Sequence, residues 1–537
     1  MEKKSPKTKK KKLPIGIQTY SQIIEEEFCY VDKTGFIARL VEEGKYYFLS
    51  RPRRFGKSLL ISTMSSVFKA RKKLFKGLNI EENWNWATVY PVIDISFGRG
   101  IVEDRKGLDE RIETILKEIA DQYTVTLSNN NIADRFAELI HQLYKKYSQP
   151  VVVLVDEYDK PILDNIDKPD KAAEILEGLK NIYSVIKDCD GYIKFAFLTG
   201  VSKFCKVSLF SGLNNLKDIT LDERYATICG YTENDLHYIF NDYTKQADLD
   251  KLKSWYNGYN YLGEKVYNPY DILLFFDSYR YKNYWFESAS PTFLIKLLKK
   301  KQYFIPALEN LQVSESILGS FDLENLFVET LLFQTGYLTI KEVEMVGPRQ
   351  VYTLNYPNME VKLSLLDYLL DFYIQDINEK NSAQTDLYKA LEKGDLALIK
   401  KIFFSLFASI PHDWYRKNEL ENYEGFYASI TYACLASLGF EMVSEDTTNH
   451  GRIDLTLFSD DKVYIFEFKV IGSTKERNTA FDQIKSKKYH EKYMNQSKDI
   501  YRIGIDFNKK ERNIDNFEWD IIKKNNNMDH KITKIKV

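Results

Sequence analysis

Two short segments near the C-terminus constrain the fold of this 537-residue chain most, because apolar and polar residues alternate strictly in both. Residues 451–457 and 463–470 flank a short polar turn, which is the pattern of a β-hairpin. Side chains two residues apart on a strand point the same way, so Glu467 and Lys469 share a face and Asp454 can face them from the neighbouring strand. Two carboxylates beside a lysine can bind a divalent cation and polarise a water molecule next to a phosphodiester.

The spacing of these three residues resembles the motif of the PD-(D/E)XK nuclease superfamily, with Asp454 as the aspartate and Glu467-Phe468-Lys469 as the (D/E)XK element. The resemblance implies that Asp454 and Glu467 bind Mg²⁺ and that Lys469 orients or activates the attacking water. Ile453 stands where the superfamily name has proline, a residue that carries no chemistry. The alternative is a surface hairpin with an ordinary salt bridge, since Glu-x-Lys is common on strands.

Two further polar residues extend the nuclease-like pattern. Glu424 lies at the start of an amphipathic helix predicted for about residues 423–438, and it resembles the extra acidic residue that such nucleases often place on their first helix. Gln483 lies in a lysine-rich helical segment and could supply another polar contact. The order helix, strand, strand, helix predicts a restriction-endonuclease-like α/β domain at residues 416–537.

A strand, a loop and a helix near the N-terminus form a second candidate site. Residues 46–50 predict a buried strand, and the next loop ends in Gly56-Lys57-Ser58 before a helix begins. This is the architecture of a P-loop, in which backbone N–H groups and the helix N-terminus bind phosphates. Lys57 would then reach the β- and γ-phosphates of ATP, and the Ser58 hydroxyl would bind Mg²⁺.

The loop departs from the usual P-loop pattern at its start. Arg51 stands in place of the customary first glycine, and residues 51–55 are bulky and cationic. Close approach of the backbone to phosphate is therefore harder, although the three loop arginines could bind phosphate directly. We include Arg54 with Gly56, Lys57 and Ser58 among the candidate nucleotide-binding residues.

A continuous apolar run further along the chain supports the P-loop interpretation. Residues 151–155 predict a central parallel strand that ends in Asp156 and Glu157. Acidic residues at the carboxyl end of such a strand lie where α/β folds bind ligands, so Asp156 suits a Mg²⁺ ligand and Glu157 suits the residue that orients the attacking water. A third strand ends in Thr199, which either contacts the γ-phosphate as a sensor or simply terminates the strand.

The segment from Leu13 to Ile228 resembles the AAA-ATPase-like family, which often precedes a PD-(D/E)XK domain in bacterial and archaeal proteins. The shared features are Tyr30-Val31-Asp32-Lys33-Thr34, the Arg-Pro-Arg-Arg-Phe-Gly-Lys-Ser loop, Val155-Asp156-Glu157-Tyr158-Asp159 and Leu213-Asn214-Asn215-Leu216. The resemblance implies ATP binding with Mg²⁺ and leads us to expect ATP hydrolysis. Arg224 is either an arginine finger or part of a surface salt bridge, and Asp32 and Lys33 either lie near the nucleotide or cap a helix.

The middle of the chain predicts a module that couples the two ends. Residues 229–360 predict a helical lid, which starts at a capping box in 231–236, and a winged-helix-like hairpin formed by 337–343 and 351–354. The hairpin is not basic, which favours a structural role over DNA binding. Residues 361–415 predict a helical connector to the nuclease-like domain.

Charge and cysteine usage restrict the partners and the compartment. The net charge is −1, so nucleic acid must bind through a local patch, and residues 469–537 carry 17 Lys and Arg against 10 Asp and Glu. The five cysteines have no paired spacing, which indicates a reducing compartment. We expect residues 1–12, with seven lysines, to be a disordered basic tail and the protein to be cytoplasmic without a membrane span.

The fold prediction is therefore an α/β protein with an N-terminal P-loop ATPase core, a helical and winged-helix lid, and a C-terminal restriction-endonuclease-like domain. We expect an ATP-regulated, Mg²⁺-dependent nuclease that acts on DNA or RNA, with DNA favoured. The alternative is a nucleotide switch whose C-terminal domain binds nucleic acid or a protein without cutting it. A homo-oligomer, such as a ring, is a further expectation.

Overall fold

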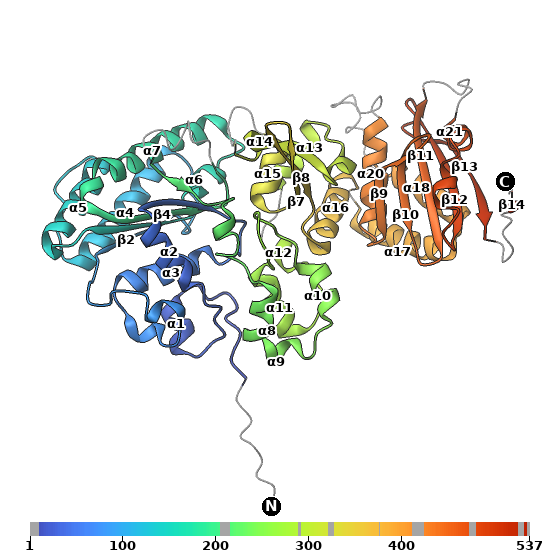
Figure 1. Ribbon diagram of the computed structural model, residues 1–537. Coiled ribbons are helices and arrows are strands. Elements are labelled where there is room, and N and C mark those ends of the chain that lie inside the picture. The colour runs from blue at the N-terminus through green and yellow to red at the C-terminus, as the bar shows by residue number, and fades with distance from the viewer. Residues whose placement is uncertain are drawn as a thin grey trace, which may run out of the picture. The chain divides into compact units, whose positions relative to one another are not determined.

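The chain forms two compact units in the computed structural model (Figure 1). The first unit comprises Met1–Phe293 and Gln312–Asn358, and the second comprises Leu294–Leu311 and Met359–Val537. The structure describes residues 10–203, 215–287, 292–319, 327–374, 376–410, 424–471, 479–524 and 531–533. Most of the predicted tail at residues 1–12, and Leu213 and Asn214 of the family segment, lie outside these ranges.

A parallel sheet in the order β2-β3-β4-β1-β5 is the centre of the first unit. Each residue of β1 and β3 is buried, which explains why both strands are continuous apolar runs in the sequence. The strands predicted at residues 46–50 and 151–155 are therefore confirmed. The bounds are β1 (Tyr46–Ser50), β2 (Val92–Ser96), β3 (Val151–Asp156), β4 (Ile193–Gly200) and β5 (Lys217–Asp218).

Helices cover both faces of this sheet. Figure 1 shows α7 along one side of the sheet and α3 along the other, and α4, α5 and α7 contact one another. Polar caps begin two of them: Asp104 accepts a hydrogen bond from Gly107 N at 2.9 Å, and Asn131 accepts one from Ala133 N at 2.8 Å. The helices are α1 (Tyr20–Glu25), α2 (Thr34–Glu43), α3 (Lys57–Phe68), α4 (Arg105–Tyr123), α5 (Ile132–Tyr147), α6 (Lys160–Leu163) and α7 (Pro169–Asp188).

Short helices follow the sheet and pack around an aromatic core. The predicted capping box is confirmed, because the Thr232 hydroxyl accepts a hydrogen bond from Asp235 N while the Asp235 carboxylate accepts one from Thr232 N. Phe240, Tyr256 and Phe276 are among the buried rings of this core. The helices are α8 (Glu233–Ile239), α9 (Asn241–Thr244), α10 (Leu249–Tyr256), α11 (Pro269–Ser278) and α12 (Tyr284–Glu287). The next helix, α13 (Thr292–Lys300), belongs to the second unit from Leu294 onward.

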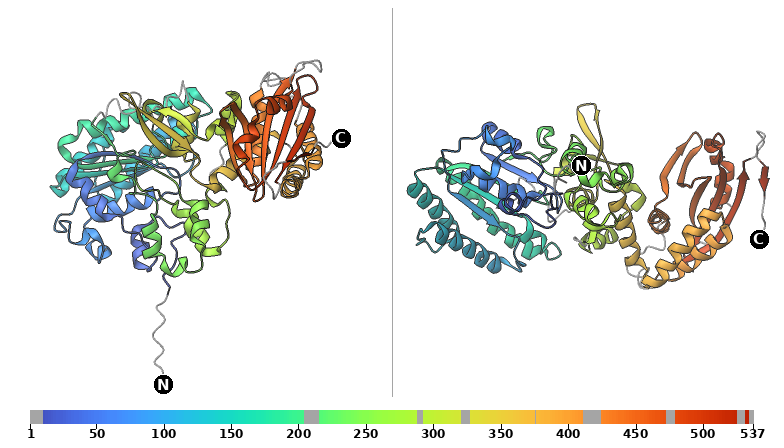
Figure 2. Two further views of the ribbon diagram at one scale, coloured as in Figure 1. Left: turned by 45° about the vertical axis from the view of Figure 1, so that its right-hand side comes forward. Right: turned by 90° about the horizontal axis from the view of Figure 1, so that it is seen from below.

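A helix and a hairpin complete the first unit. The hairpin predicted at 337–343 and 351–354 is confirmed as β7 (Thr339–Val346) and β8 (Arg349–Asn355), in a sheet of order β6-β8-β7. It is drawn in yellow in Figure 2 and projects from its surroundings in the right-hand view. The neighbouring elements are β6 (Leu311–Ser314), α14 (Glu315–Gly319) and α15 (Val328–Thr335).

The second unit is built on a mixed sheet of order β14-β13-β12-β11-β10-β9. β11 and β12 run parallel, and the other neighbouring strands of this order are antiparallel. Helix α21 (Ala480–Ser486) lies in the crossover that the parallel pair requires. The strands are β9 (Glu441–Thr448), β10 (Gly451–Phe458), β11 (Lys462–Ile471), β12 (Asp499–Asn508), β13 (Asn513–Lys523) and β14 (Lys531–Thr533).

Side chains of β11 alternate between two packed faces. Tyr464 donates a hydrogen bond to the Leu391 carbonyl on one face, whereas Val463 and Ile465 join a buried cluster with Ile484 of α21 on the other. Glu467 continues the second series, so it emerges beside α21. The predicted α/β class is confirmed in both units. The longer helices of this unit are α16 (Met359–Tyr373), α17 (Ile377–Lys393), α18 (Leu396–Ala408) and α20 (Glu424–Ala436).

The segment Leu294–Leu311, which precedes the last part of the first unit in the chain, belongs to the second unit. Glu309 accepts hydrogen bonds from Lys362 at 2.5 Å and from the Tyr432 hydroxyl at 2.7 Å, and the Ile305 amide donates to the Ser429 hydroxyl at 3.1 Å. These hydrogen bonds therefore join the segment to α16 and α20. Within the part of the chain that the structure describes, no helix combines the length and apolarity of a membrane-crossing segment.

Gly504 on β12 tests the packing of α21 on this sheet. A Cβ at Gly504 would overlap the backbone nitrogen of Phe481. We expect Gly504→Ala to lower the free energy of unfolding by about 1–3 kcal/mol, because the helix must shift to relieve the overlap. Urea denaturation measures this change. Gly191→Ala is the control, since its Cβ would meet nothing within 4 Å, and equal losses in the two variants would contradict the prediction.

Candidate functional site

The loop between β1 and α3 lies at the start of a 12-residue helix. Gly56 adopts the left-handed conformation at φ 89°, and Lys57 begins the helix. The buried Lys57 amine donates hydrogen bonds to the carbonyl oxygens of Arg51 at 2.9 Å and Pro52 at 2.8 Å. Burial lowers the pKa of Lys57, and the Asp156 carboxylate opposes this shift. A helix N-terminus with a lysine at this position suits phosphate.

Ser58 and Asp156 meet beside this loop. Asp156 ends β3, and burial raises the pKa of its carboxyl group while a hydrogen bond from the Ser58 hydroxyl lowers it. The structure thus brings the predicted Mg²⁺ pair together. A hydroxyl and a carboxylate are the hard oxygen ligands that Mg²⁺ prefers, so their chemistry fits the ion.

Glu157 follows Asp156 in an uncommon backbone conformation. Its φ of 53° is left-handed, and its amide donates a hydrogen bond to Asp156 Oδ1 at 3.0 Å. Its carboxylate lies against Gly98, where a Cβ would stand 3.1 Å from Glu157 Oε2. Glu157, Gly98 and Lys57 all line one cavity, so the predicted water-orienting residue and the phosphate-binding lysine face the same space.

Asp159 is a buried carboxylate in the same cavity wall. It accepts hydrogen bonds from Ser202 N and Ser202 Oγ, both at 2.6 Å, and from Val201 N at 3.0 Å. Burial raises the pKa of Asp159, and the Ser202 hydrogen bonds counter this rise. The sequence indicated Asp159 only as part of the family segment. Its contacts show that it joins the loop after β3 to the chain that leaves β4.

Thr199 occupies a position inside the sheet. Its side chain is fully buried, and its hydroxyl donates a hydrogen bond to the Leu49 carbonyl of β1 at 2.9 Å. Among the described residues, those that line the cavity include Val201 but not Thr199. This geometry favours the strand-end alternative over the sensor role, because the hydroxyl is used to join two strands.

Arg51 is not placed to bind phosphate as the sequence suggested, because its side chain is buried and, unlike Arg53 and Arg54, is not among the residues that line the cavity. Its fully buried guanidinium donates hydrogen bonds to the carbonyl oxygens of Ser50 and Thr220 at 2.9 Å and of Tyr225 at 3.2 Å. It also lies 3.7 Å from the centroid of the Tyr261 ring. The side chain therefore anchors the start of the loop, a role that glycine could not perform.

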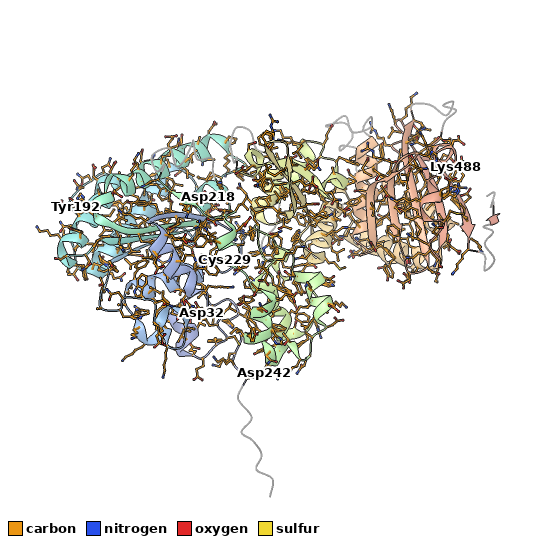
Figure 3. The ribbon with its side chains drawn as sticks, in the orientation of Figure 1. Asp32, Tyr192, Asp218, Cys229, Asp242 and Lys488 are labelled. Atoms are coloured by element: carbon orange, nitrogen blue, oxygen red, sulfur yellow. The ribbon has the colours of Figure 1, made fainter. Side chains whose placement is uncertain are left out.

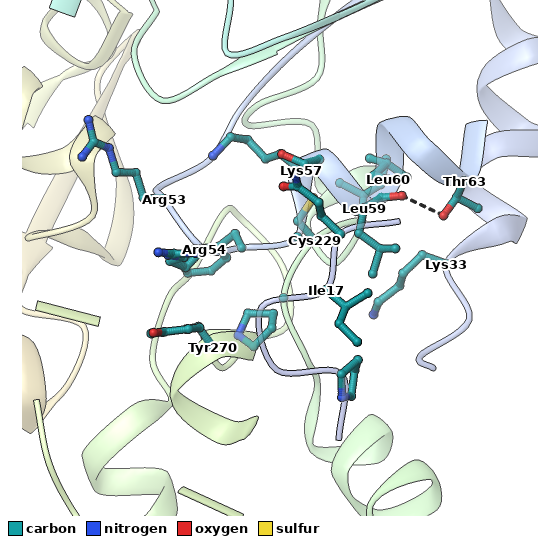
Figure 4. Close-up of a pocket in the computed structure, with 18 of the residues that line it drawn as sticks. Ile17, Lys33, Arg53, Arg54, Lys57, Leu59, Leu60, Thr63, Cys229 and Tyr270 are labelled. Carbon is teal, nitrogen blue, oxygen red and sulfur yellow. Dashed lines mark hydrogen bonds between the residues drawn. The ribbon is translucent and has the colours of Figure 1, made fainter. Parts of the chain in front are cut away.

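Arg53 and Arg54 are exposed and line the cavity. Figure 4 shows Arg54 beside Tyr270, where the guanidinium lies 4.8 Å from the ring centroid, and shows Arg53 extending away from Lys57. Arg54 is thus available for an anionic ligand, and its role as a nucleotide-binding residue stays a prediction.

The cavity measures about 430 Å³ and is lined by both polar and apolar side chains. The loop, Glu157 and Asp159 supply polar groups, which suit phosphates. Apolar and aromatic side chains, which suit a nucleobase, also line it: Pro14, Ile17, Val31, Ile228, Tyr231, Tyr270 and Leu273. Sequence reasoning missed this apolar lining, because it comes from segments with no shared motif. Cys229, labelled in Figures 3 and 4, lines the cavity as well.

Three charged residues with alternative roles are now placed. Asp32 accepts hydrogen bonds from Thr34 N at 2.8 Å and Asn79 N at 2.7 Å, which fits the helix-capping alternative. Lys33 lines the cavity and pairs with Asp235 at 2.9 Å. Arg224 forms ion pairs with Asp222 at 2.6 Å and with Glu43 at 2.9 Å, as the surface salt-bridge alternative requires.

The two predicted nuclease carboxylates lie where strands β10 and β11 separate. The paired positions run from Phe458 and Val463 to Leu455 and Phe466. Beyond them, Phe468 N donates a hydrogen bond to Asp454 Oδ2 at 2.7 Å, and Asp454 N reaches Glu467 Oε2 at 3.5 Å. The carboxylates thus take the place of the next backbone pair, and the predicted convergence of Asp454 and Glu467 is observed.

Lys469 and Glu467 emerge on the same face of β11. Lys469 pairs in register with Asp506 of the parallel strand β12, and its charge lowers the pKa that burial raises at Asp506. Asp506 Oδ1 also accepts a hydrogen bond from Ala480 N at 2.9 Å. The lysine therefore lies on the face that α21 covers, next to the two carboxylates.

Gln483 and Tyr489 support the buried Glu467 carboxylate. The Gln483 amide donates a hydrogen bond to Glu467 Oε1, so the predicted polar contact of Gln483 exists. Tyr489 hydrogen-bonds to Gln483, and burial raises its pKa, with a smaller contribution from the charge of Glu467. Gly451 passes close by, since a Cβ there would lie 3.3 Å from the Tyr489 hydroxyl. No motif or spacing in the sequence pointed to Tyr489.

Comparison with known proteins identifies a family domain around each site. Residues 14–210 match the family model described as predicted AAA-ATPase, and residues 422–517 match that of the PD-(D/E)XK nuclease superfamily. An uncharacterized protein from the vnfD 5′ region of Azotobacter chroococcum mcd 1 is 46% identical over 509 residues, which cover 95% of this chain and 98% of that protein. The chain belongs to the AAA-ATPase-like family. Its second unit carries a PD-(D/E)XK superfamily domain, so both resemblances are confirmed.

Metal binding at the nuclease-like site of this AAA-ATPase-like protein would rest on few protein ligands. No group of three or more His, Cys, Asp and Glu side chains able to hold an ion occurs among the residues the structure describes. Asp454 and Glu467 fit a Mg²⁺ ion that keeps several water ligands. Glu424 is the first residue of α20, but its side chain lies outside the described part, so its role stays a prediction.

Two loop arginines of the AAA-ATPase-like protein should behave in opposite ways. Arg51→Ala leaves buried carbonyl groups without their donor, so we expect the free energy of unfolding to fall by about 2 kcal/mol or more. Arg54→Ala should leave it unchanged but weaken ATP binding about tenfold, because an exposed cation beside the cavity is lost. Urea denaturation and titration with labelled ATP measure the two effects. Similar behaviour of both variants would contradict the assignment of Arg51 as an anchor.

Proposed function

We propose that this AAA-ATPase-like protein binds and hydrolyses ATP in its first unit and cleaves nucleic acid in its second, with the nucleotide state controlling cleavage. The observation that carries the proposal is the placement of Asp454 and Glu467 between diverging strands, with Lys469 on the same face. Two carboxylates and a lysine on one face form a site for phosphodiester hydrolysis.

In the first unit, ATP would bind with its phosphates at the loop and its base against the apolar lining of the cavity. Lys57 would contact the β- and γ-phosphates, and Ser58 and Asp156 would hold Mg²⁺, which neutralises charge on the phosphates when it is bound. Glu157 lines the same cavity and would orient the attacking water. Its strained backbone supports this role, because such conformations cluster at functional sites.

In the second unit, Asp454 and Glu467 would hold Mg²⁺, which polarises a phosphodiester and its attacking water when it is bound. Lys469 would orient or activate that water. Gln483 positions the Glu467 carboxylate through its hydrogen bond, and Tyr489 supports Gln483. Glu424 would add a further acidic group from α20.

The partner and the compartment remain part of the proposal. We infer nucleic acid as the substrate, with DNA favoured over RNA, and a cytoplasmic setting. Four cysteines that the structure describes, Cys29, Cys189, Cys229 and Cys434, are free and buried, which suits a reducing compartment. Assembly into a homo-oligomer also belongs to the proposal.

A nucleotide switch that does not cut is the second candidate. One observation favours it: Phe468 N and the Gln483 amide already donate hydrogen bonds to Asp454 and Glu467. Carboxylates satisfied in this way can also serve a purely structural role. The C-terminal domain would then bind nucleic acid or a protein partner.

A cleavage assay separates the two candidates. Single- and double-stranded DNA and RNA are incubated with Mg²⁺ or Mn²⁺, with and without ATP. We expect Lys469→Ala to lower the cleavage rate by about a hundredfold or more, since it removes the group that activates the water. EDTA should abolish cleavage by the intact protein.

Two matched variants complete this assay. Lys485→Ala removes an exposed lysine on α21 that stacks on Phe481, so it should retain most activity. Lys57→Ala should lose the response of cleavage to ATP while keeping the nuclease site. The switch candidate replaces the nuclease if ATP binds and none of the four substrates is cut by the intact protein.

A further inference from the structure

The bulky loop at residues 51–55 is held from the helical part of the first unit. The Arg51 guanidinium stacks on Tyr261, and the Phe55 ring packs edge-on against Tyr259 with centroids 4.7 Å apart. Gly230 N also donates a hydrogen bond to the Phe55 carbonyl at 3.3 Å. Both ends of the loop therefore have partners well outside the parallel sheet.

The middle of the loop contacts the segment that leads into the hairpin. Trp285 Nε1 donates a hydrogen bond to the Arg53 carbonyl at 3.2 Å, and the Trp285 ring packs on Tyr337 with centroids 5.2 Å apart. Pro52 lies directly against Gly336. These contacts join the loop at residues 51–55 to Gly336 and Tyr337, which lie shortly before β7.

Gly336 leaves no room for a side chain at this contact. It ends α15 in the left-handed conformation, with φ at 93°. A Cβ at Gly336 would stand 2.7 Å from Pro52 Cγ and 2.8 Å from Pro52 Cβ. Because β7 starts three residues later at Thr339, Pro52 lies against the junction between α15 and the β7–β8 hairpin.

The same part of the loop is bound from its other side by the phosphate-binding lysine. Lys57 Nζ donates hydrogen bonds to the carbonyl oxygens of Arg51 and Pro52. A lysine has three N–H donors, and two of them are used here, so contacts to both the β- and the γ-phosphate would require the amine to release at least one of these carbonyl oxygens. Redirection of the Lys57 amine would therefore change its contacts with the backbone of Arg51 and Pro52, and the Pro52 ring lies against Gly336.

We propose that the Pro52–Gly336 contact couples the nucleotide site to the β7–β8 hairpin, so that ATP binding changes the stability of the hairpin hydrogen bonds. The proposal rests on the proposed ATP binding at Lys57. Coupling of this kind is reciprocal, so a ligand that binds the hairpin changes ATP affinity by the same factor. The hairpin offers a surface for such a ligand, because Met345 and Val346 near its turn are 65% and 58% exposed.

Hydrogen exchange on the full chain tests the coupling. Exchange of the backbone amides of β7 and β8 is measured with Mg²⁺ alone and with Mg²⁺ plus a non-hydrolysable ATP analogue. We expect the analogue to change exchange rates in the hairpin of the unaltered protein by about fivefold or more. Gly336→Ala should lose this response, because the added Cβ would overlap the Pro52 ring and displace it from residue 336.

A glycine in the same hairpin supplies the matched control. Gly347 also has a left-handed φ, 61°, but a Cβ there would meet nothing within 4 Å. Gly347→Ala therefore introduces backbone strain without touching the loop, and it should keep the response to the analogue. Loss of the response in both alanine variants would overturn the proposal, since strain alone would then explain the result.

Two further variants protect the test against misfolding of Gly336→Ala. Pro52→Ala trims the ring that touches Gly336, and Trp285→Phe removes the hydrogen bond to Arg53 while keeping an aromatic ring. Each should weaken the response. A hairpin response at the unaltered level in Pro52→Ala would overturn the proposal.

Failure of the coupling can be told from failure of ATP binding. A thermal unfolding midpoint of the unaltered protein that does not rise with the analogue and Mg²⁺ would refute the proposed nucleotide site. The coupling would be overturned, and the nucleotide site kept, by a different pair of results. In these, the analogue raises the unfolding midpoint of both the unaltered protein and Gly336→Ala, and it changes hairpin exchange rates equally in both.

Discussion

The buried guanidinium of Arg51 is the interaction on which the nucleotide site depends. Removing a charge from water is costly unless hydrogen bonds replace hydration, and here the carbonyl oxygens of Thr220 and Tyr225 and the ring of Tyr261 do so. The loop cannot leave this position without losing these partners together. Lys57 in turn donates a hydrogen bond to the Arg51 carbonyl. The lysine that would contact phosphate is therefore positioned by an arginine whose own side chain is buried away from the cavity.

In the nuclease-like site two carboxylates are held in place, and N–H groups supply their hydrogen bonds. Asp454 and Glu467 are kept between two strands by backbone and side-chain N–H groups, because the strands stop pairing at Leu455 and Phe466. Gly504 lets α21 approach the sheet closely enough for Gln483 to reach Glu467. The absence of one side chain on β12 thus determines the surroundings of a carboxylate on β11.

The sequence predicted what local patterns encode and missed what distant segments assemble. Alternation and continuous apolar runs located β1, β3, β10 and β11. Motif spacing correctly predicted that Ser58 lies beside Asp156 and Asp454 beside Glu467. The role of Arg51 could not be predicted, because its partners lie about 170 residues away and are backbone carbonyls, which any residue type supplies. The apolar lining of the cavity and Tyr489 were missed because they too involve segments far apart in the chain. For Thr199 the pattern fitted a sensor and a strand end equally.

The chain passes between its two units three times, after Phe293, Leu311 and Asn358. The short piece Leu294–Leu311 supplies Glu309 to Lys362 and Tyr432, and Ile305 to Ser429, before the rest of the second unit has been synthesised. A fragment that starts at Met359 would therefore lack part of its own interior. The ATPase-like and nuclease-like units of this protein are interlaced rather than joined end to end, so neither can be cut out, exchanged or released by proteolysis at one site as an intact body.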